Sequence, residues 1–216
     1  MKKIMFSCKY GLEQGVIART KTKTRRVDKR LNHPLVTEIS DWCVDDKGKY
    51  YLTITYSTGL TEDVYPAYQI GEEVAVAQSY QTLIEQGYLT EGRKDGWVNE
   101  KYITSAGYDN KMFVAAEHMP HRIRITDIKV ERLQDISEED AMKEGVFKYD
   151  EPPLHHEMDL YAPWHPSIKP YKHDNENLVY RCSARYAFAY LINKINGTGT
   201  WQKNPWVFAY TFELVR

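Results

Sequence analysis

The segment from Ala18 to Arg26, which reads ARTKTKTRR, alternates hydroxyl and cationic side chains and ends on two adjacent arginines. It contains a chemically useful pair, Lys21 and Thr24. A lysine withdrawn from water has a depressed pKa and can act as a base toward a neighbouring hydroxyl. The cations of the segment also suit an anion such as a phosphate. The segment is therefore the first candidate for a functional site.

The conformation of this segment decides which side chains meet. In a continuous strand, Lys21, Lys23 and Arg25 share one face, and Thr24 and Arg26 lie on the other. If the chain instead turns before Lys21 and then extends, Lys21 and Thr24 converge. Lys23 and Arg25 are expected to face solvent, where Arg25, like Arg26, is available to a ligand. The competing interpretation is an edge strand whose cations prevent unwanted pairing, because charge runs are commonly solvated surfaces.

A carboxylate candidate, Glu144, follows a helix signature. Ser137 with Asp140 three residues later resembles a capping box and predicts a short helix that Gly145 ends. Most glutamates on such helices face solvent, so the helix pattern alone gives Glu144 no role.

Two further residues are candidates for contact with a ligand. Arg122 lies in a strand-like segment and extends the positive surface. Trp201, near two glycines, is suited to stacking on a base, as aromatic platforms do in single-strand binders. Trp206 alternates with Phe208 and Tyr210, a pattern more typical of a strand that faces the core.

Metal and cofactor chemistry has no support in the pattern of residues. His155, His156 and His165 fit no recognised zinc spacing, and nearby prolines disfavour a helix there. The three cysteines are widely separated, and no glycine-rich phosphate loop occurs. We therefore predict no metal and no cofactor. The odd, scattered cysteines favour a reducing cytoplasm.

The elements that must position these residues are mostly strands. Strands are expected at 50–60, around Val74 to Val76, from about 112 to 130 and at 204–216. Helices are expected at 7–18 with Ser7 as N-cap, after Ser137, and at 183–197. The stretches 81–110 and 147–177 lack periodicity and are predicted to be insertions. We expect an α+β fold, a small mixed β-barrel with flanking short helices, as one domain over residues 1–216.

The charge balance limits the choice of partners. The 216 residues include 29 Lys and Arg against 30 Asp and Glu, so no global positive field drives nucleic-acid binding and any basic site is local. No apolar run approaches a membrane span, and the one near the N-terminus is too short for a signal peptide. We predict a cytoplasmic protein that does not bind a membrane.

Several stretches resemble the ASCH domain family. "VIARTKTKTRRV" resembles its signature segment, "YQIGEEVAV" its glycine turn into a strand, and "IKVERLQDISEEDAMKEGV" its strand and short acidic helix. "GTGTWQKNPWVFAYTFELV" resembles the last strand of phage and prophage members. The resemblance implies a PUA-like β-barrel that binds RNA, a nucleotide or a modified nucleoside in a cationic cleft.

A branch of that family consists of amidohydrolases that act on acetylated cytidine with a lysine, a threonine and a glutamate. These fall on Lys21, Thr24 and Glu144, and the following arginine of the motif falls on Arg26. Three functions remain open. The leading one is binding of RNA, a nucleotide or a modified nucleoside. The alternatives are removal of an acyl group from N4-acylated cytidine, and a noncatalytic phage or prophage accessory role with a protein partner.

Overall fold

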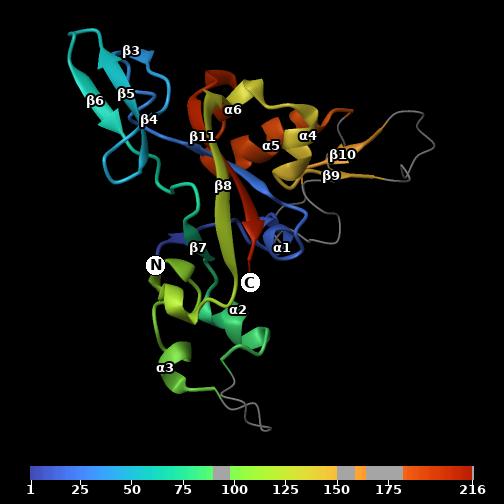
Figure 1. Cartoon of the computed structure of the whole chain (residues 1–216). Coiled ribbons are helices and arrows are strands. Elements are labelled where there is room, and N and C mark those ends of the chain that lie inside the picture. Colours follow the sequence, from blue (N-terminus) through green and yellow to red (C-terminus); the bar gives the residue numbers. More distant parts are fainter. Residues whose placement is uncertain (90–97, 150–158, 164–181, 216) are drawn as a thin grey trace. The chain divides into compact units, whose positions relative to one another are not determined.

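The structure, a computed structural model, describes residues 1–89, 98–149, 159–163 and 182–215. The described chain is a mixed α+β fold of strands and mostly short helices (Figure 1). It divides into two compact units, the first made of residues 1–6, 73–124 and 214–216, and the second of residues 7–72 and 125–213.

The first unit contains strands at one edge of a sheet, together with short helices. Strand β7 (Glu73–Val76) pairs in parallel with β1 (Lys3–Ile4) and antiparallel with the start of β8 (Arg122–Arg132). The helices are α2 (Tyr80–Glu85), α3 (Glu100–Ile103), η1 (Lys111–Phe113) and η2 (Ala116–His118). Leu83, Val114 and Met119 lie in its core. Helices α2 and α3 lie in the stretch predicted to be an insertion.

The second unit is built on the strands β8, β11 (Trp206–Leu214) and β2 (Lys23–Val27), in that order. Strands β11 and β2 are antiparallel, with Tyr210 opposite Thr24 and Phe208 opposite Arg26. Directly opposed residues share a face of a sheet, so these four side chains lie on one face. Lys23 and Arg25 lie on the other.

Helices cover the face that carries Lys23 and Arg25. They are η3 (Leu133–Asp135), α4 (Glu138–Lys143), α5 (Ala184–Asn196) and α6 (Thr200–Lys203). Their core includes Leu133, Ala141 and Phe188, together with Val207 of β11. The short strands β9 (Phe147–Lys148) and β10 (Tyr161–Ala162) pair beside them.

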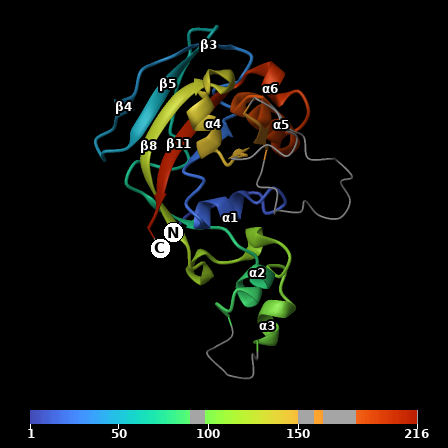
Figure 2. The same ribbon diagram turned by 90° about the vertical axis from the view of Figure 1, so that its right-hand side faces the viewer.

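A small antiparallel sheet lies across the other face. Strand β5 (Tyr50–Tyr56) is central and pairs with β3 (Val36–Ile39), β4 (Cys43–Val44) and β6 (Thr61–Val64). Figure 2 shows β8 and β11 between this small sheet and the helices α4 and α5. Leu52, Ile54 and Val64 are buried on its inner side. No sheet closes on itself within the described parts of the chain, so the α+β class is confirmed, whereas a closed barrel is not seen there.

Two helix starts illustrate what local sequence can determine. Helix α1 (Leu12–Ile17) begins later than predicted. Its N-cap is Gly11, with φ 64°, and not Ser7. Helix α4 begins as predicted, since Ser137 Oγ accepts a hydrogen bond from the Asp140 N–H. Gly145, with φ 104°, follows its C-cap.

No helix in the described ranges is long and apolar enough to cross a lipid bilayer.

Helix α5 has a cap that comes from another element. Ser183 stands at its N-cap without capping it through its side chain. Instead, the Glu138 carboxylate of α4 accepts the Ala184 and Arg185 N–H groups at 2.6 and 3.2 Å, and the Ser183 hydroxyl at 2.5 Å. A carboxylate at this position satisfies N–H groups that have no partner within the helix and suits the helix dipole.

We predict that Glu138→Ala lowers the free energy of unfolding by about 1–2 kcal/mol, because the first turn of α5 loses its acceptor. Urea unfolding followed by far-ultraviolet circular dichroism measures the change. The matched control is Glu139→Ala, which removes the neighbouring exposed carboxylate and should leave stability nearly unchanged. Equal effects of the two substitutions would contradict this role of Glu138.

Candidate functional site

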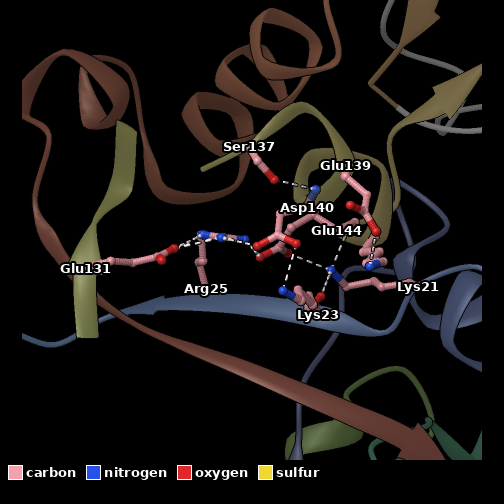
Figure 3. Close-up of polar contacts among 9 residues, drawn as sticks. Lys21, Lys23, Arg25, Glu131, Ser137, Glu139, Asp140 and Glu144 are labelled. Atoms are coloured by element: carbon pink, nitrogen blue, oxygen red, sulfur yellow. Dashed lines mark hydrogen bonds and ion pairs between the residues drawn. The ribbon is translucent and has the colours of Figure 1, made fainter. Parts of the chain in front are cut away.

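Lys21 and Glu144 form a buried ion pair. Lys21 Nζ donates to Glu144 Oε2 at 2.8 Å, to the Glu144 carbonyl at 2.6 Å and to the Lys23 carbonyl at 2.7 Å (Figure 3). The two side chains are only 1% and 5% exposed. An ammonium group has three protons to donate, and here three acceptors surround it. The pair joins the start of β2 to the C-terminal end of α4.

Arg25 extends the pair into a network. Its guanidinium donates to Glu144 Oε1 at 3.1 Å, to Asp140 Oδ2 at 3.2 Å and, through Nε, to Glu131 Oε1 at 2.7 Å. Lys23 Nζ reaches Asp140 Oδ1 at 2.7 Å. Figure 3 shows Arg25 lying between Glu131 and the carboxylates of α4.

The expected exposure of Arg25 and Lys23 is therefore wrong. Arg25 is 4% exposed and Lys23 is half-buried. The physical reason is that α4 and β8 cover this face of β2 with carboxylates, so the cations pair inside the protein. Helix α4 carries Asp140 in its first turn and Glu144 at its C-cap, and both acids reach the same strand.

Burial and charge act differently on the two buried cations. Burial lowers the pKa of Lys21 below its ordinary value, and the nearby Glu144 carboxylate opposes this without reversing it. Burial also disfavours the charge of Arg25, but Glu144 and Glu131 outweigh it and raise its pKa. Within the network, Lys21 is thus the cation whose proton is bound less tightly than usual, which is the property that a general base requires.

The opposite face of β2 places Arg26 among aromatic side chains. Arg26 is half-buried and shares this face with Thr24, Phe208 and Tyr210. The ring of Tyr68 packs edge-on against that of Tyr210, with centroids 5.4 Å apart. The ring of Trp42 packs at a tilt on that of Phe208, with centroids 6.1 Å apart.

Burial lowers the pKa of Arg26, and the nearby Glu144 carboxylate opposes this without reversing it. An anion placed beside the guanidinium would favour the charged form. Phe208 and Tyr210 are buried under the small sheet, so the partly exposed residues here are Arg26 and two aromatic residues that pack on them, Tyr68 and Trp42.

The other two candidates, Trp201 and Arg122, belong to helix α6 and strand β8. Trp201 is half-buried in α6, where it packs edge-on against Phe188 of the helical core at 6.3 Å. Arg122 is half-buried and belongs to the first unit, where it lies opposite Ala75. The three histidines considered for a metal site are outside the described residues. In the described ranges, no group of His, Cys, Asp and Glu side chains could hold a metal ion.

The structure thus brings Lys21 and Glu144 together across 123 residues of sequence. It adds partners that sequence reasoning missed, namely Glu131 and Asp140 around Arg25, and Tyr68 near Arg26. Asp140 carried a signal as the acid of the helix-start signature, whereas Tyr68 lies in a loop without any pattern. Comparisons of the chain with protein-family models, curated proteins and solved structures find no match.

We predict that Lys21→Met destabilises the protein by about 3–5 kcal/mol, because it leaves the buried Glu144 carboxylate without one of its two cations. Urea unfolding at neutral pH measures the loss. Lys143→Met is the control, since that lysine pairs with Glu139 on the exposed surface of α4 and should matter little. A similar small effect for both substitutions would show that the buried pair does not stabilise the fold.

Proposed function

We propose that this protein binds a nucleotide or a modified nucleoside, free or within RNA, on the face of β2 and β11 that carries Thr24 and Arg26. The observation that supports this most directly is the environment of Arg26. Arg26 is half-buried, and the half-buried residues Tyr68 and Trp42 pack on Tyr210 and Phe208, which share its face of the sheet. Phosphate and a planar base are the two chemical groups that such a surface fits.

The neighbouring cations contribute less to this binding. Lys21, Lys23 and Arg25 are already paired with Glu144, Asp140 and Glu131. Their charges are balanced within the protein, so an incoming phosphate would have to compete with carboxylates at each of them. Arg26 is therefore expected to be the main contact to phosphate among the cations of β2.

The relationship to the ASCH family and its PUA-like barrel is part of the same proposal. The two stretches that carry the family's lysine, threonine and glutamate, the signature segment and the short acidic helix, lie in one compact unit. Lys21 and Glu144 are hydrogen bonded there. The contact between Lys21 and Glu144 supports the resemblance, because a family's site residues should converge when the fold is shared. Thr24 lies on the face of β2 opposite to Arg25, which pairs with Glu144.

We predict that cytidine 5′-monophosphate and a short single-stranded RNA bind with an affinity that falls as salt rises, because the phosphate contact releases counterions. Arg26→Gln should weaken binding roughly 10-fold or more, since it removes a charge-assisted hydrogen bond. Isothermal titration calorimetry measures both effects.

The control is Lys47→Gln, which removes an exposed cation in the turn before β5 and should not change affinity. Equal affinity in Arg26→Gln and the parent protein would refute the role of Arg26. Failure of every nucleotide, nucleoside and RNA to bind would refute the proposed function and favour a protein partner instead.

A second candidate function is hydrolysis of an N4-acylated cytidine. The observation that favours it is the lowered pKa of the buried Lys21 beside Glu144. In this reaction, neutral Lys21 would take a proton from the Thr24 hydroxyl or from water, and the oxygen would attack the acyl carbon. The bond from that carbon to N4 would break, and Glu144 would pass the proton from Lys21 to the departing nitrogen. If Thr24 is the attacking group, water would then hydrolyse the acyl-threonine ester and release the acid.

If the protein is such an amidohydrolase, it releases cytidine and acetate from N4-acetylcytidine, as chromatography of the reaction mixture would reveal. Thr24→Val keeps the shape of the side chain on the buried strand, and Thr24 is 5% exposed. We expect this variant to lose turnover while its circular dichroism spectrum is unchanged, if Thr24 is the nucleophile. Absence of any turnover by the unaltered protein would exclude this activity.

A further inference from the structure

The loop after β6 places an aromatic side chain, Tyr68, against Tyr210, with ring centroids 5.4 Å apart, and Tyr210 shares its face of the sheet with Arg26. The Arg26 guanidinium partly counteracts the rise that burial causes in the pKa of Tyr68. The ring is half-buried, so part of its surface is accessible. Its edge-on contact with the buried Tyr210 ring supports it from the side of the sheet.

The backbone that carries Tyr68 is held at several points. The hydroxyl of Tyr210 accepts the Ala67 N–H at 3.1 Å and also a backbone hydrogen bond from Tyr68. The side chain of Gln69 accepts the Tyr50 N–H at 2.8 Å and donates to the Tyr50 carbonyl at 3.1 Å. These bonds tie the loop to β11 and to β5. A ring on a fixed loop loses little conformational entropy when a ligand packs against it.

We propose that Tyr68 is a stacking platform for the base of the ligand, so that the site selects nucleotides over phosphates that lack an aromatic base. This rests on the proposed function, because it assumes that the phosphate lies at Arg26. The base would lie against the accessible part of the Tyr68 ring while the phosphate contacts the guanidinium. Stacking of a base on an aromatic side chain strengthens binding by roughly 5- to 150-fold.

The first test compares three probes on the unaltered protein by calorimetry: cytidine 5′-monophosphate, ribose 5-phosphate and inorganic phosphate. We expect cytidine 5′-monophosphate to bind at least about 5-fold more tightly than ribose 5-phosphate, because only the former has a ring to stack. Equal affinities for these two probes would overturn the proposal without any substitution in the protein.

The second test assigns that difference to one side chain. Tyr68→Leu should reduce the affinity for cytidine 5′-monophosphate to that for ribose 5-phosphate, and leave the affinity for ribose 5-phosphate unchanged. Tyr68→Phe keeps the ring and should retain the preference for the base. Tyr186→Leu, on the exposed surface of α5, should have no effect.

The outcomes separate this inference from the proposed function. If binding requires Arg26 but Tyr68→Leu keeps the preference for the base, the platform is refuted and the proposed function stands. Loss of the preference in Tyr68→Phe would also refute stacking, because the ring is still present. If none of the three probes binds, both proposals fail.

Discussion

The buried ion pair between Lys21 and Glu144 is the constraint around which the second unit is arranged. Removing two charges from water is costly, and their attraction repays the cost only when geometry is good and the remaining donors find acceptors. Here the ammonium has two backbone carbonyls besides the carboxylate, and the other carboxylate oxygen accepts from Arg25. The pair therefore requires α4 to end at one particular place on β2.

Features of α4 that look local serve this placement. Ser137 determines where the helix begins, and the left-handed conformation of Gly145 lets the chain leave directly after Glu144. A Cβ atom at Gly145 would lie 2.9 Å from Leu12 Cδ2 and would require that side chain to move. The residue after the carboxylate must therefore be small and must tolerate a positive φ. The buried charge, the cap and the glycine act as one structural unit.

Successive side chains of β2 point to opposite faces of the sheet, and the two faces have different surroundings. Lys23 and Arg25 point to the helices, where carboxylates neutralise them. Thr24 and Arg26 point to the aromatic side, where burial is the strongest influence on the guanidinium. A run of cations that composition alone treats as uniform thus divides into members paired with carboxylates on one face and Arg26 among aromatic residues on the other.

The sequence predicted features that depend on near neighbours. The cap at Ser137, the strand at β5 and the alternation of Trp206, Phe208 and Tyr210 follow from patterns within a few residues, and the structure contains them. The partners of Arg25 were not predictable in this way, because Glu131, Asp140 and Glu144 lie more than 100 residues away and approach only after α4 packs on the sheet. The meeting of Lys21 and Glu144 was anticipated through family resemblance and not through periodicity. The start of α1 was misplaced because a left-handed Gly11 overrides the preference of serine for N-caps.

The strand order of the second unit has a consequence for synthesis of the chain. Strand β11 lies between β8 and β2, yet it begins about 180 residues after β2 ends. At cellular rates of translation, β2 waits roughly ten to forty seconds for the strand that pairs with it. During that time its edge and the cations Lys21 and Arg25 are exposed to solvent or to a chaperone. A nascent chain that bears an unpaired polar edge, and not an unpaired apolar one, is better protected from aggregation while it waits.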